Sequence, residues 1–306
     1  MAHAGTAEQA ALLARLIDHG LLLVSRVPGV YGRSGEFEDV CQAVAALVSA
    51  GVACEQPERL LFPPILPRED LETVGYLKSF PHLAGSIFAF AGDEEQAVAQ
   101  YDRASRHEDW SEFQRMTNLV LTPAACYPVY PAVAARGRLP AGGVLVDAGG
   151  AYVFRNEPSA DPARMQMFHQ RELVRIGEPA AVTAWRARWR DRAVALLRSL
   201  GLQAQLQVAA DPFFGRSGRM LAASQREQEL KFEVAVQIAG VEATALASFN
   251  YHQDHFAAAY GIELADGAPA HSACLGFGLE RIALALFAAH GLDLHGWPAE
   301  VRGELW

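Results

Sequence analysis

The stretch Cys-Leu-Gly-Phe-Gly-Leu-Glu-Arg, at residues 274–281, leads directly into an apolar helical pattern. Gly276 and Gly278 let the backbone turn and approach a ligand closely. The apolar residues that follow share one helical stripe, so Arg281 is expected in the first turn of a helix. Free N–H groups and a guanidinium at that place both favour an anionic phosphate. Taken alone, such a strand-to-helix turn is more often structural, and it lacks the third glycine of a dinucleotide-binding fingerprint.

A predicted β-hairpin upstream carries a polar face. Residues 144–157 and 164–176 have strand-like patterns and are joined by a short, turn-rich segment. Strand alternation places Arg155 and Glu157 on one face. If Glu157 lies opposite Arg164, the same face also carries Gln166, Phe168, Gln170 and Glu172. Such a face is either the floor of a binding site or a solvated side of the sheet.

The remaining patterns describe an α+β protein. Helical periodicity occurs in five segments, at residues 9–17, 38–49, 95–106, 182–199 and 279–289. Strand-like runs occur at residues 82–90, 144–157, 164–176, 202–208, 232–241 and 245–251. Consecutive strands joined by short loops favour antiparallel pairing, so we expect a mainly antiparallel sheet flanked by helices. Without a linker-like segment, residues 1–306 are expected to form a single domain, with 1–61 packed on the core as an N-terminal extension.

The composition restricts the class of protein. The chain has 306 residues, with 26 Lys and Arg against 35 Asp and Glu, and therefore a formal charge of −9. This acidic balance argues against broad nucleic-acid binding, which requires a basic surface. No uninterrupted apolar stretch reaches the ~20 residues of a membrane span, and the N-terminus lacks a secretory pattern. Four cysteines in so long a chain form no disulfide framework, so we expect a reduced, cytoplasmic protein without a membrane partner.

Two motifs together resemble motifs 2 and 3 of the class II aminoacyl-tRNA synthetases. The first is Phe-Arg-Asn-Glu at residues 154–157, followed after a loop by Arg164 and Phe168, and the second is Gly-Phe-Gly-Leu-Glu-Arg at residues 276–281. The resemblance implies a class II catalytic core that binds ATP with Mg²⁺ and forms a homodimer. The implied reaction is attack of a carboxylate on the α-phosphorus of ATP, which depends mainly on charge stabilisation and in-line positioning.

The same resemblance implies a role for each matching residue. Arg155 would hold the α-phosphate, Glu157 would accept a hydrogen bond from the adenine amino group, and Phe168 would stack on the base. Arg281 would bind the γ-phosphate of a bent ATP on the other face of the adenine ring. Arg155 and Arg281 are therefore the expected catalytic residues. The other residues expected to bind ATP are Arg164, Gly276 and Gly278.

The middle of the chain resembles the seryl-tRNA synthetase branch of that class, in Gly-Tyr-Leu-Lys-Ser-Phe at 75–80 and Thr-Pro-Ala-Ala-Cys-Tyr-Pro at 122–128. Cys126 stands where the second motif usually has a glutamate that holds the substrate ammonium. A thiol is a poor partner for an ammonium, but once deprotonated it is a strong ligand for Zn²⁺. With Glu172 and Cys274 it resembles the zinc site of atypical seryl-tRNA synthetases and of amino acid:[carrier protein] ligases. Three such ligands leave one tetrahedral position for a substrate amino group.

The length of the N-terminal part bears on the choice between these two families. Residues 1–61 show no sustained heptads, so no separate tRNA-binding domain and no tRNA partner are expected. The favoured function is activation of a small amino acid (Gly or Ala) by ATP and transfer to the phosphopantetheine thiol of an acyl-carrier-like protein. Two alternatives stay open: a truncated seryl-type paralogue that charges tRNA, and a non-catalytic paralogue that binds nucleotide or zinc.

Three polar residues, Lys231, Ser248 and Asn250, fall in strands that by resemblance line the amino-acid pocket. Lys231 could hold the substrate carboxylate or a phosphate, and a solvated lysine at a strand end is equally compatible with its position. Leu246 stands where the seryl branch has an acidic Mg²⁺ ligand. The open candidates for its substitute are Glu233 and Glu242.

His252 and His255 have a spacing that could suggest a pair of metal ligands. On a strand, this spacing would direct the two rings to opposite faces. We therefore expect a loop or a helix start at this place, with a structural role for both histidines.

Overall fold

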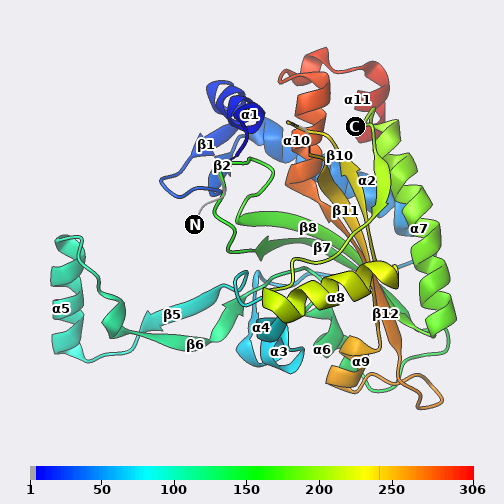
Figure 1. Ribbon diagram of the computed structural model, residues 1–306, viewed down its shortest axis with the longest axis horizontal. Coiled ribbons are helices and arrows are strands. Elements are labelled where there is room, and N and C mark those ends of the chain that lie inside the picture. The colour runs from blue at the N-terminus through cyan, green and yellow to red at the C-terminus, as the bar shows by residue number, and fades with distance from the viewer. Residues whose placement is uncertain (1–4, 241) are drawn as a thin grey trace.

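The computed structural model describes residues 5–240 and 242–306, and its centre is one seven-stranded sheet (Figure 1). The strand order is β3-β7-β8-β12-β11-β10-β9, and every neighbouring pair is antiparallel except β3 with β7. The strands are β3 (Glu58–Leu60), β7 (Val144–Phe154), β8 (Met167–Gly177), β9 (Gln205–Val208), β10 (Lys231–Val236), β11 (Thr244–Gln253) and β12 (His271–Gly278). The predicted mainly antiparallel α+β fold is confirmed, and Val241, the end of one predicted strand, lies outside the described residues.

The hairpin of β7 and β8 has the predicted register. Val153 pairs with Phe168 and Phe154 with Met167, and beyond the strand ends the backbone N–H of Arg155 donates to the carbonyl of Gln166 at 2.8 Å. Continuing this register brings the ends of the connecting loop together. The polar side chains of the hairpin therefore share one face of the sheet, as the alternation predicts.

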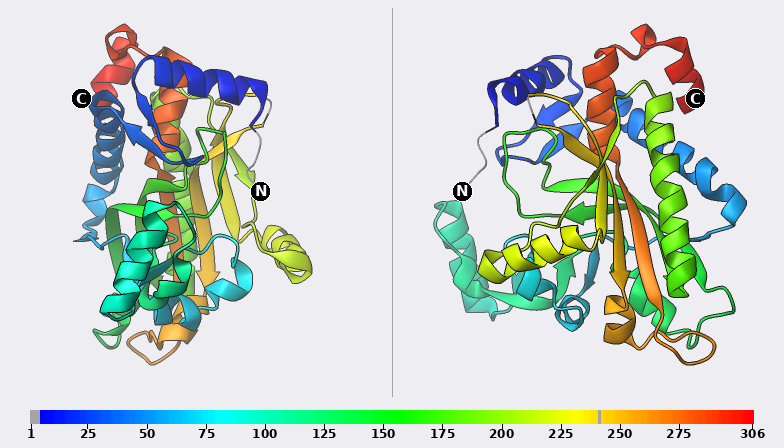
Figure 2. Two further views of the ribbon diagram at one scale, coloured as in Figure 1. Left: turned by 90° about the vertical axis from the view of Figure 1, so that its left-hand side faces the viewer. Right: turned by 45° about the vertical axis from the view of Figure 1, so that its right-hand side comes forward.

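Helices that the sequence periodicity predicts pack in one core with the sheet. They are α1 (Ala7–Asp18), α2 (Gly35–Val52), α7 (Pro179–Ser199) and α10 (Leu279–His290), joined by α11 (Ala299–Leu305). Odd-numbered strand residues such as Leu173, Phe249 and Leu275 share one core with these helices. α7 and α10 lie on the sheet, and α2 packs on α10 (Figure 2). The hairpin of β1 (Leu22–Val24) and β2 (Tyr31–Arg33) lies beside α1.

The segment Gly35–Glu55, which contains α2, is long and apolar enough to cross a membrane by length and composition. Charged residues in its first turn interrupt the apolar run, so the sequence alone predicted no span. Buried side chains of α2, including Phe37, Val44 and Val48, belong to the core shared with α10. Packing inside the protein therefore explains the apolar character of this helix.

Shorter elements surround the opposite face of the sheet. They are α3 (Arg68–Thr73), α4 (Tyr76–Ser79), α6 (Val129–Ala134), α8 (Gly215–Glu227) and α9 (His255–Tyr260). Four of them have six residues or fewer, too few to show a full helical pattern, which is why the sequence did not predict them. Even-numbered strand residues such as Val146, Val174 and Cys274 join this second core.

An arm projects from the body of the molecule at the left of Figure 1. Its base is the three-stranded sheet of β4 (Ile65–Pro67), β6 (Gln114–Leu121) and β5 (Ser86–Phe90), and its tip is α5 (Glu94–Ser105). α5 has no buried residue among those described. The apolar side chains of this arm are therefore left largely uncovered within one copy of the chain.

Candidate active site

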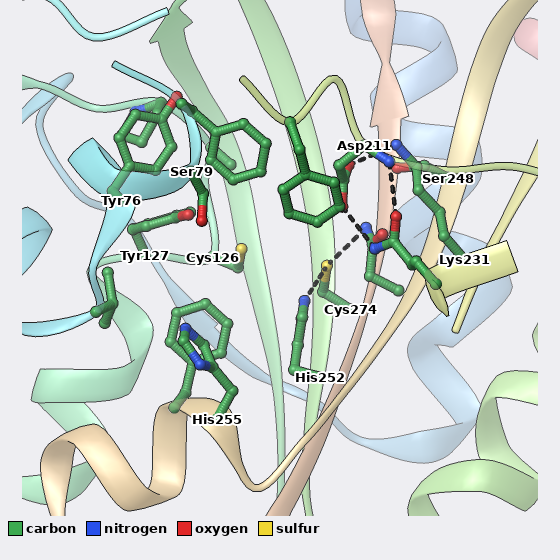
Figure 3. A pocket seen from close by; sticks show the side chains of 18 of the residues that line it. Tyr76, Ser79, Cys126, Tyr127, Asp211, Lys231, Ser248, His252, His255 and Cys274 are labelled. Carbon is green, nitrogen blue, oxygen red and sulfur yellow. Dashed lines mark hydrogen bonds and ion pairs between the residues drawn. The ribbon is translucent and has the colours of Figure 1, made fainter. Parts of the chain in front are cut away.

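A cavity of about 360 Å³ lies on the sheet face that the short helices surround (Figure 3). Its floor is made by even-numbered residues of adjacent strands, because alternate side chains of a strand point to the same face. From β8 come Gln170 and Glu172, from β11 come Ser248 and Asn250, and from β12 comes Cys274. The walls are the loop before α6, the turn around α4, the loop before α8 and the start of α9.

Two thiols and one carboxyl group lie close together in this cavity. The ligand atoms of Cys126, Glu172 and Cys274 all lie within 4.8 Å of one another, and all three residues are buried. Gly276, which pairs with Glu172 across β12 and β8, makes this approach possible. A Cβ atom at Gly276 would lie 2.8 Å from Oε1 of Glu172. The backbone N–H of Cys126 also donates to the Glu172 carboxylate, so the loop before α6 and β8 are joined at this point.

The protonation states of these three groups depend on one another. Burial, followed by the charge of Cys274, raises the pKa of Glu172 to about 8. The pKa of Cys126 is raised because its thiol donates to Cys274 and is buried, and that of Cys274 is lowered because its sulfur accepts this bond. Two sulfurs and a carboxylate that are buried together are a ligand set for Zn²⁺. The group therefore fits a divalent cation.

The other end of the site is positively charged. The Arg155 guanidinium lies 5.8 Å from the centre of the Phe168 ring, and Arg164 is 4.0 Å from Glu157. Arg281 is held by two backbone carbonyls: its Nε donates to Ala163 at 2.8 Å and an Nη to Ala245 at 3.1 Å. Burial, and then repulsion by the two other arginines, lowers the pKa of Arg281 to about 10. Such a crowded set of cations favours a polyanionic ligand.

Lys231 lies in the cavity wall and is buried, in contrast to the alternative of a solvated lysine. Its Nζ is 2.7 Å from Oδ1 of Asp211 and 3.0 Å from Oε1 of Glu233. Burial lowers the pKa of Lys231, but the two carboxylates outweigh this and raise it, so the ammonium stays charged. The paired lysine ties the loop before α8 to β10, and its charge is largely neutralised before any substrate arrives.

The predicted polar residues of β11 also reach the cavity. Ser248 and Asn250 line it, and Nδ2 of Asn250 is 3.6 Å from the sulfur of Cys274. Oδ1 of Asn250 is buried and, within the described part of the chain, has no hydrogen-bond partner. An unsatisfied buried acceptor beside a cavity is suited to a ligand N–H or O–H.

His252 is a site residue that the sequence reasoning interpreted wrongly. It lies in strand β11, not in a loop or helix start, and its Nε2 is 3.7 Å from the sulfur of Cys274 (Figure 3). Alternate residues of a strand share one face, so a strand that places Ser248 and Asn250 in the cavity also places His252 there. This pattern could have identified His252 as a site residue. Asp211 was also missed, and nothing in its local sequence distinguishes it from an ordinary loop aspartate.

Comparisons with known proteins place the chain in a family. It is 46% identical over 278 residues to amino acid–[acyl-carrier-protein] ligase 1 of Bradyrhizobium diazoefficiens, which covers 90% of this chain and 85% of the relative. Ligase 2 of the same organism is 46% identical over 281 residues, covering 91% and 83%. This chain belongs to the amino acid–[acyl-carrier-protein] ligase family. No family model matches the chain.

Solved structures show the fold that members of this ligase family share with synthetases. M. kandleri SerRS, in complex with A. aeolicus tRNASec, has a TM-score of 0.80 at 20% identity and covers 96% of this chain. Seryl-tRNA synthetase from Pyrococcus horikoshii, complexed with ATP, has a TM-score of 0.68 at 15% identity. The chain spans only 60% and 62% of these two proteins. The class II core inferred from the two motifs is confirmed.

Proposed function

We propose that the chain activates a small amino acid as an aminoacyl-adenylate and transfers it to the phosphopantetheine thiol of a carrier protein. The observation that carries this proposal is one continuous cavity that contains the Cys126–Glu172–Cys274 group and also reaches Arg155. An amino group held at one end of that cavity leaves the substrate carboxylate free to extend towards the arginine end. Membership of the ligase family supports the carrier protein as acceptor.

We propose Zn²⁺ as the cation of this three-residue group. Cys126, Glu172 and Cys274 would hold the ion, which would supply a Lewis acid for a neutral amino group. Oδ1 of Asn250 is suited to accept a hydrogen bond from that amino group. The rings of Tyr127, His252 and Phe256 line the cavity. These rings limit the space for a substrate side chain, which supports Gly or Ala.

The arginines carry the first chemical step. A carboxylate oxygen of the amino acid attacks the α-phosphorus, and the bond to pyrophosphate breaks. Arg155 stabilises charge on the α-phosphate and Arg281 on the leaving phosphates, with adenine between Arg281 and Phe168. Mg²⁺ enters with ATP in this proposal. Glu233 is the candidate ligand that supports this, because its carboxylate, after that of Glu157, is close enough for its charge to act on Arg281. Leu246 is buried and offers no ligand atom.

In the second step the sulfur of the carrier's pantetheine attacks the carbonyl carbon of the adenylate. A thioester forms, the bond from that carbon to the phosphate oxygen breaks, and AMP leaves. Arg155 is placed to stabilise the leaving phosphate again, because AMP departs from the position where the α-phosphate was held. The thiol proton leaves with the attack and passes to solvent.

Charging of tRNA is the second candidate. The chain is 27% identical to the type-2 serine–tRNA ligase of Methanopyrus kandleri over 273 residues, which cover half of that protein. The higher identity to the carrier-protein ligases favours a carrier over tRNA. A non-catalytic paralogue is disfavoured because Arg155, Phe168 and Arg281 accompany a complete ligand set.

The test is pyrophosphate exchange into ATP with each of the twenty amino acids, followed by transfer of the labelled amino acid. We expect exchange with Gly or Ala, and transfer to a pantetheinylated carrier but not to its unmodified form or to bulk tRNA. Label on tRNA alone would replace this proposal by the second candidate. Absence of exchange with every small amino acid would contradict both.

We also propose a homodimer, a cytoplasmic location and no membrane partner. The exposed apolar side chains of the arm, such as Phe88 at 57% exposure, support a second copy as their cover. All four cysteines are free, and two of them can act as metal ligands only in reduced form, which supports a reducing compartment.

A further inference from the structure

We propose that His252 is a positioning residue that holds the sulfur of Cys274 and thereby adjusts the metal, an inference that rests on the proposed cation site. Nε2 of His252 is 3.7 Å from that sulfur, and Nδ1 is 3.1 Å from the Tyr130 hydroxyl and 3.3 Å from the Ser272 hydroxyl. Figure 3 shows the ring of His252 directed at Cys274 from the end of β11.

The Cys274 thiolate can only accept a hydrogen bond, so it selects the tautomer of His252 that carries the ring proton on Nε2, and the two hydroxyls are placed to donate to Nδ1 of that tautomer. A hydroxyl can donate its hydrogen to Nδ1, and then Nε2 carries the ring proton. Tyr130 is fully buried, and burial raises the pKa of its phenol, so it stays an O–H donor. The imidazole is thereby set to donate from Nε2 to the Cys274 sulfur.

Aromatic packing fixes the orientation of this imidazole. The Phe256 ring stacks on Tyr130 with centroids 3.8 Å apart, and its edge meets the His252 ring at 4.9 Å. Tyr130 and His252 are themselves perpendicular, at 6.1 Å. A ring held from two sides cannot swing into another rotamer without breaking these contacts.

His252 acts behind the sulfur and not as a fourth ligand. It does not belong to the group of residues whose ligand atoms lie within 4.8 Å of one another. Asn250 is a second N–H donor to the same sulfur, at 3.6 Å. Among the described residues no side-chain N–H donor bonds to the sulfur of Cys126, so the two sulfurs are not equivalent.

This inequality has a chemical consequence. Hydrogen bonds to a thiolate withdraw electron density from the sulfur, and such partners of a ligand tune the bound metal. A Cys274 thiolate that gives less electron density to the cation leaves that cation more electrophilic. The cation then binds its fourth ligand, the substrate amino group, more strongly. His252 therefore acts on the binding of the amino acid and not on that of ATP.

The test uses the Co²⁺-loaded full-length protein, whose sulfur-to-metal absorption band reports on the thiolates. In His252→Phe we expect full Co²⁺ loading, a shift of this band to longer wavelength, and a several-fold rise in KM for the amino acid with KM for ATP unchanged. His255→Phe is the matched control, because His255 lines the same cavity without a bond to Cys274. Its band should stay at the wild-type position.

His252→Gln is a second variant, for the case that the phenylalanine ring of His252→Phe disturbs the packing. Its side-chain amide can still donate a hydrogen bond to the sulfur of Cys274. A band at the wild-type position in this variant supports the inference, and a band shifted as in His252→Phe overturns it. Unchanged absorption in a fully loaded His252→Phe protein overturns this inference alone. A wild-type protein that binds no Co²⁺ overturns the metal proposal and this inference with it.

Discussion

Gly276 determines where the Glu172 carboxylate can lie. A methyl group at this position would come within 2.8 Å of Oε1 and 3.3 Å of Cγ of Glu172. In Gly276→Ala we expect the carboxylate to be displaced and metal affinity to fall by at least about tenfold, with the fold retained. Elemental analysis after dialysis against a chelator measures this. Gly278→Ala is the control, because its Cβ would meet nothing closer than 3.7 Å; equal metal content in the two variants would contradict the prediction.

Metal binding should also depend on pH. Because the pKa of Glu172 is raised to about 8 and that of Cys126 is raised too, the metal-free site holds protons that a cation must displace. We expect affinity to weaken as the pH falls from about 9 to 6, because Cys126 must lose its proton, and more steeply below about 8, where Glu172 must lose one too, by roughly tenfold per pH unit for each displaced proton. Competition with a chromophoric chelator between pH 6 and 9 measures the slope. A flat profile would show that the ligands are already deprotonated.

The same raised pKa gives the metal-free protein an unusual pH dependence of stability. Glu172 binds its proton more tightly in the folded than in the unfolded state, where its pKa is near 4.5. The free energy of unfolding should therefore fall as the pH rises from about 4.5 to 8, by at most ~1.4 kcal/mol per unit. Denaturant titrations at several pH values test this. Glu172→Gln should remove that part of the slope, because its amide does not titrate.

Among the elements, the long helices could be predicted from sequence and the central strand β12 could not. The helical periodicity of the apolar residues in α2 and α10 is visible in the sequence alone, because each helix buries one face. β12 contains Gly276 and Gly278, which disfavour strands, so the sequence predicted the strand-to-helix turn at its end but not the strand itself. Its place is set by hydrogen bonds to β8 and β11, which are far away in the sequence. Non-local pairing of this kind leaves no local signal.

The candidate site shows the same limit. The polar face of β8 followed from alternation and hairpin register alone. The grouping of Cys126 with Cys274 followed only from family resemblance, because residues so far apart in sequence carry no information on their distance. Asp211 and His252 act through contacts with Lys231 and Cys274. Such partners become visible only when the strands are assembled.

Arg33 couples the N-terminal hairpin to the arginine-rich end of the site, where we propose that ATP binds. This residue forms an ion pair with Glu280, and the side chains are 10% and 2% exposed. Glu280 also accepts from the backbone N–H of His169 at 2.8 Å, so it connects the start of α10 to the strand that carries Phe168. The pair therefore holds Arg281 and Phe168 at a fixed separation across the expected adenine position.

In Arg33→Met we expect a loss of about 3 kcal/mol in the free energy of unfolding, since Glu280 would stay buried without its cation. KM for ATP in pyrophosphate exchange should rise several-fold, and KM for the amino acid should not. Arg68→Met is the control, because its ion pair with Glu72 is exposed at the surface and should contribute less than about 1 kcal/mol. Equal effects of the two substitutions would show that Arg33 does not act through the site.

For the whole molecule, the arm is the part that one copy of the chain does not stabilise by itself. Two paired strands are marginally stable in water, and a helix of 12 residues is close to the lower limit for independent stability. Phe88 and Met116 face each other across β5 and β6, and both are exposed. A second copy that covers this pair would stabilise the arm and supply the apolar centre of an interface.

We therefore expect the wild-type protein to sediment as a dimer at micromolar concentration, and the double variant Phe88→Ser, Met116→Ser to sediment as a monomer. Leu206→Ser is the matched control: Leu206 is as exposed as many arm residues but lies on β9, at the far edge of the large sheet, and its loss should leave the dimer intact. Analytical ultracentrifugation distinguishes these states. A monomeric wild-type protein would contradict the dimer itself, and a double variant that stays dimeric would place the interface outside the arm.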